Sequence, residues 1–274
     1  MSNDVVLSAG VRTNLLQLQR TANLISATQV RLATGKRVNS ALDNPINYFT
    51  AQGLTNRASD LGNLLDSMSS GISTIQAANN GITSITKLVQ SAQALASQAM
   101  QTTDPTVRSG LAAQFDAIRG QIDQLARDSG FNGINLLDVT NSANLTVTLN
   151  ESGSSSVTIN AVDFTSTGLA LNNSSNNWAT TADINLASAD LTVGLTRLRA
   201  QAQAFGSNLS TVQIRQDFTK AMINTLQSGA DGLTLADSNE EGANLLALQT
   251  RQQLSTTALS LASQASQAVL RLFQ

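Results

Sequence analysis

The 274-residue chain contains no histidine and no cysteine, and only two of its residues are prolines. Without histidine it lacks the side chain most used for acid–base catalysis near neutral pH and for binding transition metals. Without cysteine it forms no disulfide, no thiolate nucleophile and no zinc–thiolate site. These absences exclude much of enzymology and leave only a catalyst that works through carboxylates alone, for which no paired acids stand out. We therefore predict that the protein is not an enzyme and that it uses no metal or other cofactor.

Charge is also scarce in this sequence. The 16 basic and 18 acidic residues make up 12% of the chain, and the formal net charge is -2 at pH 7. A typical soluble domain is about 25% charged. The chain has no basic field to attract nucleic acid and no apolar run that would span a bilayer as a helix. We therefore predict that it binds no nucleic acid and does not insert into a membrane. Its start lacks the pattern of a cleavable secretory signal, which fits a cytoplasmic protein or export by a route that reads no such signal.

What the chain does contain is apolar residues at alternating steps of three and four, the pattern of coiled-coil helices. Asp104 and Pro105 interrupt this pattern and separate two helices. Alternating residues at 145–149 and 157–159, joined by a polar turn, are typical of a β-hairpin. The sequence predicts a mainly α-helical fold, a long antiparallel coiled-coil bundle of its N- and C-terminal halves with a small β-hairpin insert. The predicted helices cover residues 11–32, 61–100, 111–125, 191–212 and 245–273.

The first and last of these helices carry apolar stripes that we predict to be an assembly seam. Burial of so few large side chains does not offset the entropy of ordering each helix alone. We therefore expect these helices to be disordered until they pair with each other or with other copies. The predicted seam consists of Val11, Leu15, Leu18, Ile25 and Leu32 in the first helix, and of Leu245, Leu248, Leu254, Leu261, Val269 and Leu272 in the last.

Two smaller patterns concern the helices themselves. Four glycines recur in or beside the long second helix, at Gly53, Gly62, Gly71 and Gly81. They mark either tolerance of glycine in a very long helix or close backbone approach to a neighbouring helix or subunit. The segment that starts at Asp237 begins like a calcium-binding loop but lacks the bidentate glutamate at its twelfth position, so we predict a helix N-cap there.

Serine clusters lie in the predicted hairpin turn and in the polar loop that follows it. Two interpretations stay open for them, because they are either acceptors of O-linked sugar or ordinary solvated loop residues. The residues concerned are Ser154, Ser155, Ser156, Ser174 and Ser175.

Three blocks of the sequence resemble conserved parts of bacterial flagellins. Residues 34–44 are similar to the flagellin signature S-G-x-R-I-N-S-A-x-D-D, and residues 131–137 to F-N-G-x-x-L-L. Residues 242–273 resemble the flagellin C-terminal helix, so the resemblance covers nearly the whole chain. The signature residues that match are Gly35, Arg37, Asn39, Ser40 and Asp43 in the first block, and Phe131, Asn132 and Gly133 in the second.

This resemblance implies a fold and a function. In flagellins the terminal helices form an inner tube, and the helices nearer the middle of the chain form an outer tube around it. Residues 1–42 and 235–274 would be the inner core, disordered in the free subunit, and residues 43–137 and 184–234 the outer core. Residues 138–183 would form the hairpin and a short variable insert, without large outer domains. The chain would be a structural subunit, exported unfolded by the flagellar type III apparatus, that polymerises into the extracellular filament for motility.

The resemblance also implies partners. They are other copies of the chain, sibling flagellins, an export chaperone at the C-terminal helix, the export gate, the filament cap and hook–filament junction proteins. Two alternatives remain from the sequence. A hook–filament junction protein shares the terminal helices but is present in few copies, and a cytoplasmic coiled-coil scaffold would be helical as a monomer and would dimerise without growing.

The chain departs from the flagellin pattern at two places. Pro45 follows Asn44 where flagellins have alanine, and we expect it to stiffen the connection between the two cores. Vertebrate Toll-like receptor 5 recognises many flagellins at a charged segment of the long outer-core helix. Ser91, Gln93 and Ala94 replace two arginines and a glutamate of that segment, so charge-assisted contacts are lost and we predict weak or absent receptor activation.

Overall fold

The computed structural model describes residues 9–140 and 144–272, apart from the side chains of residues 9, 266 and 269–272. The chain divides into two compact units. Unit 1 comprises residues 1–56 and 225–274, and unit 2 comprises residues 57–224. Two long helices, α2 (Pro45–Met100) and α4 (Thr181–Thr234), contribute to both units. The fold is mainly α-helical, as predicted.

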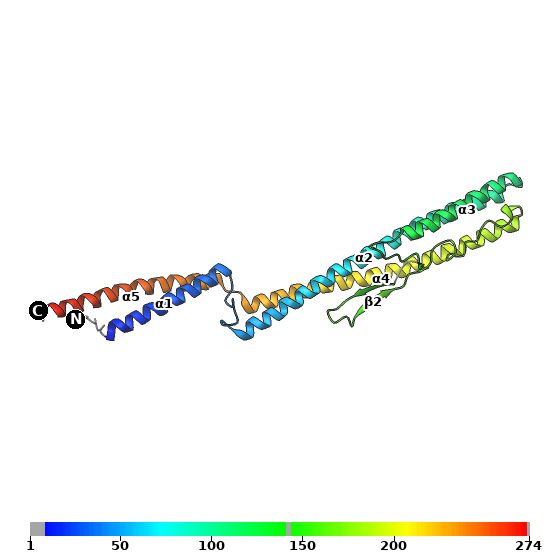
Figure 1. Cartoon of the computed structure of the whole chain (residues 1–274). Helices are drawn as coiled ribbons and strands as arrows, with labels where there is room; N and C mark the ends of the chain where they lie inside the picture. Colours follow the sequence, from blue (N-terminus) through cyan, green and yellow to red (C-terminus); the bar gives the residue numbers. More distant parts are fainter. Residues whose placement is uncertain (1–8, 141–143, 273–274) are drawn as a thin grey trace, which may run out of the picture. The chain divides into compact units, whose positions relative to one another are not determined.

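In unit 1, the terminal helices α1 (Ala9–Thr34) and α5 (Ser238–Leu272) lie side by side and run antiparallel (Figure 1). Helix α5 begins with the predicted cap, because Asp237 Oδ1 accepts hydrogen bonds from the backbone N–H groups of Asn239 at 2.8 Å and Glu240 at 3.3 Å. Acidic residues in its first turn are favoured by the positive end of the helix dipole. The N-cap interpretation of this segment is thus confirmed.

Helix α2 begins at Pro45, well before the predicted start near residue 61. Asn44 ends the preceding turn, and its Oδ1 accepts a hydrogen bond from the backbone N–H of Asn47 at 3.0 Å. Proline at the first helical position loses no helical hydrogen bond, and its fixed φ suits the helix. Pro45 is therefore the first residue of a long helix.

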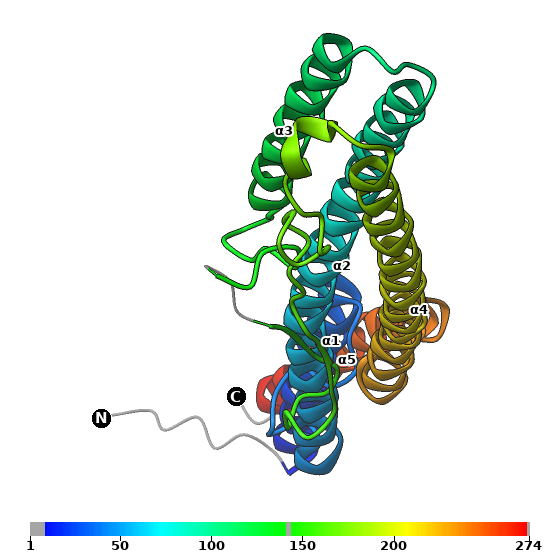
Figure 2. The same ribbon diagram turned by 90° about the vertical axis from the view of Figure 1, so that its right-hand side faces the viewer.

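Unit 2 packs α2, α3 (Pro105–Asp128) and α4 along one another (Figure 2). The predicted break before α3 is present, since Asp104 Oδ1 caps that helix by accepting from the Thr106 N–H at 2.8 Å. The predicted hairpin is also present. Strands β1 (Leu145–Thr148) and β2 (Ser156–Ile159) pair antiparallel, with Leu145 opposite Ile159. A short 3-10 helix, η1 (Ser175–Trp178), precedes α4.

The core of unit 2 is built from the predicted heptad positions. On α4 the buried side chains include Leu191, Leu198, Phe205 and Val212. They pack in one cluster with the buried positions of α2 and α3 and with the inward side chains of the hairpin. Phe115 of α3 contacts the buried Trp178 at a ring-centroid distance of 5.1 Å. Hydrophobic spacing thus identified the core of this unit.

Two of the four α2 glycines lie where another segment comes close. A Cβ at Gly71 would lie 2.6 Å from Val147 Cγ2 of the hairpin, and a Cβ at Gly81 would lie 2.2 Å from Ser129 Oγ. Gly53 and Gly62 face open space. Close approach of another segment of the chain therefore explains Gly71 and Gly81, whereas no segment of the described chain explains Gly53 and Gly62.

Many helical serine and threonine hydroxyls bond to their own helix. Each donates to the carbonyl oxygen four residues earlier, an arrangement that competes only weakly with the helix itself. The residues that do so include Thr21, Thr55, Ser67, Ser73, Thr74, Thr83, Thr86, Ser91, Ser97, Thr192, Thr196, Thr211 and Thr250.

Among the helices described, none combines the length and apolar character needed to cross a membrane.

Candidate functional site

The terminal helices contact each other through two rows of side chains on α1, one apolar and one polar. Val11, Leu18, Ile25 and Leu32 are half-buried, as is Asn14, and Thr21 and Thr28 are buried. The opposing side chains of α5, identified by their reduced exposure, are Glu241, Leu245, Leu248, Gln252, Ser255, Leu259 and Ala262. The contact thus uses six of the predicted seam residues and adds polar residues that the sequence did not single out.

Three other predicted seam residues, Leu15, Leu254 and Leu261, point away from this contact. Leu15 is 39% exposed, and Leu254 and Leu261 are each 68% exposed. The side chains of Val269 and Leu272 lie outside the described residues. Further large apolar side chains that are exposed on these two helices are Leu16, Leu24, Val30 and Leu246. A pair of helices buries only one face of each, so these side chains have no cover within unit 1 among the residues described.

One ion pair joins the two helices near the end of α1. Arg31 Nη1 lies 3.1 Å from Glu241 Oε1, and Glu241 is 7% exposed. Together with Leu24, Thr28 and Leu248, these side chains line a pocket of about 300 Å³ between the helices. Within residues 9–140 and 144–272 no group of side chains could hold a metal ion.

The first flagellin-like signature forms the connection after α1, held against the start of α5. Gly35 has φ +67°, a conformation that favours glycine and ends α1. The Arg37 N–H donates to the carbonyl oxygen of Thr234 at 2.7 Å, and the Ala236 N–H donates to the carbonyl oxygen of Gly35 at 3.0 Å. We call these backbone contacts between residues 35–38 and 234–236 the terminal clasp.

Asp43 orders the second part of the same signature. Its Oδ2 accepts hydrogen bonds from the backbone N–H groups of Ser40 at 2.9 Å and Asn39 at 3.0 Å, and from the Ser40 hydroxyl. These bonds, those from the backbone first, hold the pKa of Asp43 below its usual value. The signature residues Asn39, Ser40 and Asp43 thus build one loop.

The second signature, Phe131-Asn132-Gly133, is a tight turn. Phe131 and Ile134 exchange both backbone hydrogen bonds, at 2.8 and 3.0 Å. Asn132 and Gly133 both have positive φ, 50° and 79°, the geometry for which Asn-Gly is favoured. This signature therefore reverses the chain after α3.

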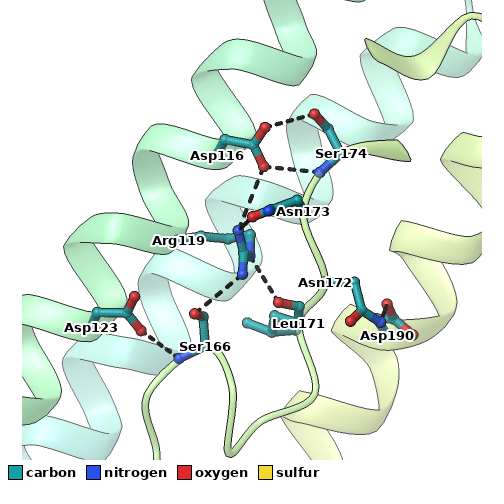
Figure 3. Close-up of polar contacts among 9 residues, drawn as sticks. All are labelled: Asp116, Arg119, Asp123, Ser166, Leu171, Asn172, Asn173, Ser174 and Asp190. Carbon is teal, nitrogen blue, oxygen red and sulfur yellow. Dashed lines mark hydrogen bonds and ion pairs between the residues drawn. The ribbon is translucent and has the colours of Figure 1, made fainter. Parts of the chain in front are cut away.

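A polar cluster missed by the sequence analysis anchors the loop after the hairpin to α3 (Figure 3). Asp123 Oδ1 accepts from the Ser166 N–H at 2.6 Å, and Arg119 donates to the carbonyl oxygen of Leu171 at 2.8 Å. Asp116 accepts from the backbone N–H of Ser174 at 2.9 Å and from its hydroxyl at 2.6 Å. In the sequence, the only sign of this cluster is that Asp116, Arg119 and Asp123 are separated by three and four residues. This spacing does not reveal which loop residues they bind.

Arg108 was also missed. It is 6% exposed, and its guanidinium donates to the carbonyl oxygens of Ala99, Thr102 and Ala179 at 3.2, 2.7 and 3.2 Å, and to Thr181 Oγ1 at 3.3 Å. A buried guanidinium satisfied by carbonyl groups leaves no sequence pattern, because its partners are backbone atoms. It joins the end of α2, the start of α3 and the start of α4.

The serines considered as sugar acceptors differ in their surroundings. Ser154, at the hairpin turn, is exposed and accepts a hydrogen bond from the side-chain amide of Asn150, whereas Ser174 is held by Asp116. Ser155 is half-buried, and Ser156 and Ser175 are exposed. Both interpretations of these residues remain predictions.

The counterpart of the receptor-binding segment lies on α2 in unit 2. Ser91 and Ala94 are exposed and Gln93 is half-buried, and the Ser91 hydroxyl donates to the carbonyl oxygen of Lys87 at 3.1 Å. This surface presents no charge at the three positions. Weak receptor activation stays a prediction.

Comparisons with known proteins agree with these features. Two family models match, the bacterial flagellin N-terminal helical region over residues 11–142 and the bacterial flagellin C-terminal helical region over residues 191–273. The chain is 30% identical to the flagellins FljO and FljK of Caulobacter vibrioides, over 99% of each chain, and 24% identical to a flagellin of Brucella melitensis over 98% of this chain and 99% of that one. A crystal structure of Bacillus cereus flagellin has a TM-score of 0.49 at 21% identity, over 57% of this chain and 88% of that one. The chain belongs to the bacterial flagellin family, the structural subunits of the flagellar filament outside the cell.

Proposed function

We propose that this chain polymerises with copies of itself into a flagellar filament for motility, after export in an unfolded state through the flagellar type III apparatus. The observation that carries the proposal is the outward apolar face of the terminal helix pair, above all Leu15 on α1 and Leu254 and Leu261 on α5. Within the described part of the chain no other segment covers this face.

The chemistry of α5 suits burial against several neighbours. From Gln252 to Val269 the helix contains no charged residue, so covering it removes no ion from water. Each leucine that becomes fully buried contributes about 1.5–3 kcal/mol. A face of this kind gains stability from every additional copy that packs on it.

The contact between the two helices is weak in the free subunit. It includes Asn14, Thr21 and Thr28 on α1 and Gln252 and Ser255 on α5, and its apolar side chains are only half-buried. We propose that residues 1–42 and 235–274 form the inner core, become fully ordered on assembly, and thereby supply the free energy of polymerisation. Residues 43–137 and 184–234 would form the outer core, and residues 138–183 the short insert.

The proposed partners follow from the same assembly. They are further copies of the chain and sibling flagellins, with hook–filament junction proteins below and the cap above. An export chaperone would cover the apolar face of α5 before secretion, and the export gate would receive the unfolded chain.

We expect Leu261→Asp to abolish filament growth, because a carboxylate would replace a leucine in the surface that other copies cover. Leu261→Met is the matched control, since it changes the same side chain and keeps it apolar and of similar volume. Filaments would be scored by sedimentation and electron microscopy after seeding, and the fold of unit 2 by the fluorescence of Trp178, the single tryptophan. Filaments of normal yield from Leu261→Asp would contradict the proposal, and a wild-type chain that forms only dimers would favour a scaffold instead.

A further inference from the structure

The contact face of α1 repeats itself every seven residues. Its apolar row is Val11, Leu18, Ile25 and Leu32, and its polar row is Asn14, Thr21 and Thr28. If α5 slid by one heptad, about 10 Å at 1.5 Å per residue, it would meet Leu18 in place of Ile25 and Thr21 in place of Thr28. Each exchange replaces a residue by one of the same kind. The face therefore does not by itself distinguish the observed register from a slipped one.

The ion pair at the end of α1 does distinguish them. Glu241 is buried and lies 3.1 Å from Arg31. A slip by one heptad in one direction would place Glu241 opposite Leu24, and a slip in the other would carry it beyond Thr34, the last residue of α1. In either case a buried carboxylate would lose its cation, which is costly.

The terminal clasp acts at the same end of the helix pair. The bonds from Ala236 to Gly35 and from Arg37 to Thr234 join the connection after α1 to the connection before α5. They fix the two backbones only a few residues from Arg31 and Glu241. The ion pair and the terminal clasp thus favour the same register of α1 against α5.

We propose that Arg31, Glu241 and the terminal clasp are positioning elements that set the register of α1 against α5. The register decides how the outward leucines of α1 are aligned with those of α5 along the pair, so a slipped pair would present a different surface to other copies. The biological role of the register rests on the proposed function, whereas the register itself is a property of the single chain.

The natural absence of cysteine allows the register to be read by disulfide trapping. Thr21→Cys would be combined in turn with Gln252→Cys, Leu245→Cys and Leu259→Cys. Thr21 lies ten residues before Arg31 and Gln252 eleven after Glu241, and both face the partner helix. Only the pair with Gln252→Cys should link within the chain, since the other two positions lie about 10 Å along the helix, beyond the Cα separation of about 7 Å that a disulfide tolerates.

Removal of the positioning elements should change this pattern. Glu241→Ala combined with Ala236→Pro removes the ion pair and the N–H that bonds to Gly35. We expect the Thr21–Gln252 link to fall several-fold and one or both slipped links to appear. Glu240→Ala, which removes an exposed acid beside Glu241, should leave the wild-type pattern of links unchanged. Exchanging the charges by Arg31→Glu with Glu241→Arg, with Ala236 kept, preserves an ion pair and should also leave that pattern unchanged.

The inference is overturned if the variant that lacks the ion pair and the Ala236–Gly35 bond of the clasp still links Thr21→Cys only to Gln252→Cys. Trp178 fluorescence would confirm that unit 2 stays folded in every variant. Links would be measured on the soluble chain and on sedimented polymer. A wild-type chain that forms no polymer would refute the proposed function, while the links in the soluble chain would still decide the register.

Discussion

Gly81→Ala should destabilise unit 2, although alanine is the better helix former. Gly81 lies inside α2 where the chain that follows α3 crosses it. An ideal Cβ at this position would lie 2.2 Å from Ser129 Oγ and 2.6 Å from Leu137 Cδ1. Favourable contacts between carbon atoms need about 3.5–4.0 Å. Ser129 and Leu137 must therefore move, and Leu137 belongs to the buried core.

The magnitude follows from three contributions. Replacing glycine by alanine in a helix interior stabilises by about 1 kcal/mol, and overpacking a core costs about 1–3 kcal/mol. The Ser129 hydroxyl donates to the carbonyl oxygen of Leu125 at 2.6 Å, a bond worth about 1 kcal/mol that the new methyl group would disturb. The net loss is about 1–3 kcal/mol, which lowers the Tm of a domain of this size by about 2–12 °C.

Gly62→Ala provides the control on the same helix. No atom lies within 4 Å of a Cβ at this position, so only the helix propensity changes. We expect its Tm to rise by about 2–4 °C. Thermal unfolding would be followed by circular dichroism and by the fluorescence of the buried Trp178. If Gly81→Ala raised the Tm as Gly62→Ala does, the close approach at Gly81 would not constrain the fold.

Two further predictions concern polar groups. Arg108→Met should destabilise unit 2 by about 3 kcal/mol, since it removes the donor to three carbonyl groups and to Thr181 Oγ1, and an unchanged Tm in thermal unfolding would contradict this role. Asp43→Asn should speed proteolysis of the loop after α1 at neutral pH, because the carboxylate accepts from the N–H groups of Ser40 and Asn39. These bonds lower the pKa of Asp43, so its stabilisation is complete above its ordinary value of 3.8 and is lost as the pH falls through the lower folded pKa. The difference from wild type should disappear in strong acid, and equal cleavage at neutral pH would refute the assignment.

The helices, the core of unit 2 and the hairpin could be predicted because each depends on local pattern. The predicted helix at 191–212 has apolar residues at steps of three and four, and among them Leu191, Leu198 and Val212 are buried. The break before α3 was evident from Asp104 and Pro105, whose capping chemistry is local. The start of α2 was misplaced, since apolar spacing before residue 61 is irregular and the decisive cap is the side chain of Asn44.

Features that depend on the third dimension were not predictable. Spacing alone treats Gly62 and Gly81 alike, and only the path of another segment separates them. The contact between α1 and α5 uses Thr21 and Thr28, which hydrophobic spacing alone does not select. The left-handed conformation of three successive residues, Asn176, Asn177 and Trp178, was likewise not evident from the sequence, nor was the packing of the buried indole against Phe115.

The hydroxyl groups that bond back to their own helix lower the free-energy cost of removing water from a helix surface. Thr192, Thr196 and Thr211 each have their donor satisfied within α4, so a neighbour that displaces water from them strands no O–H group. A charged side chain that is covered needs an ion of opposite charge in the neighbour. A hydroxyl that is not bonded within its own helix needs an acceptor there. Covering the hydroxyls of Thr192, Thr196 and Thr211 therefore costs little, because each O–H group keeps its acceptor within the helix.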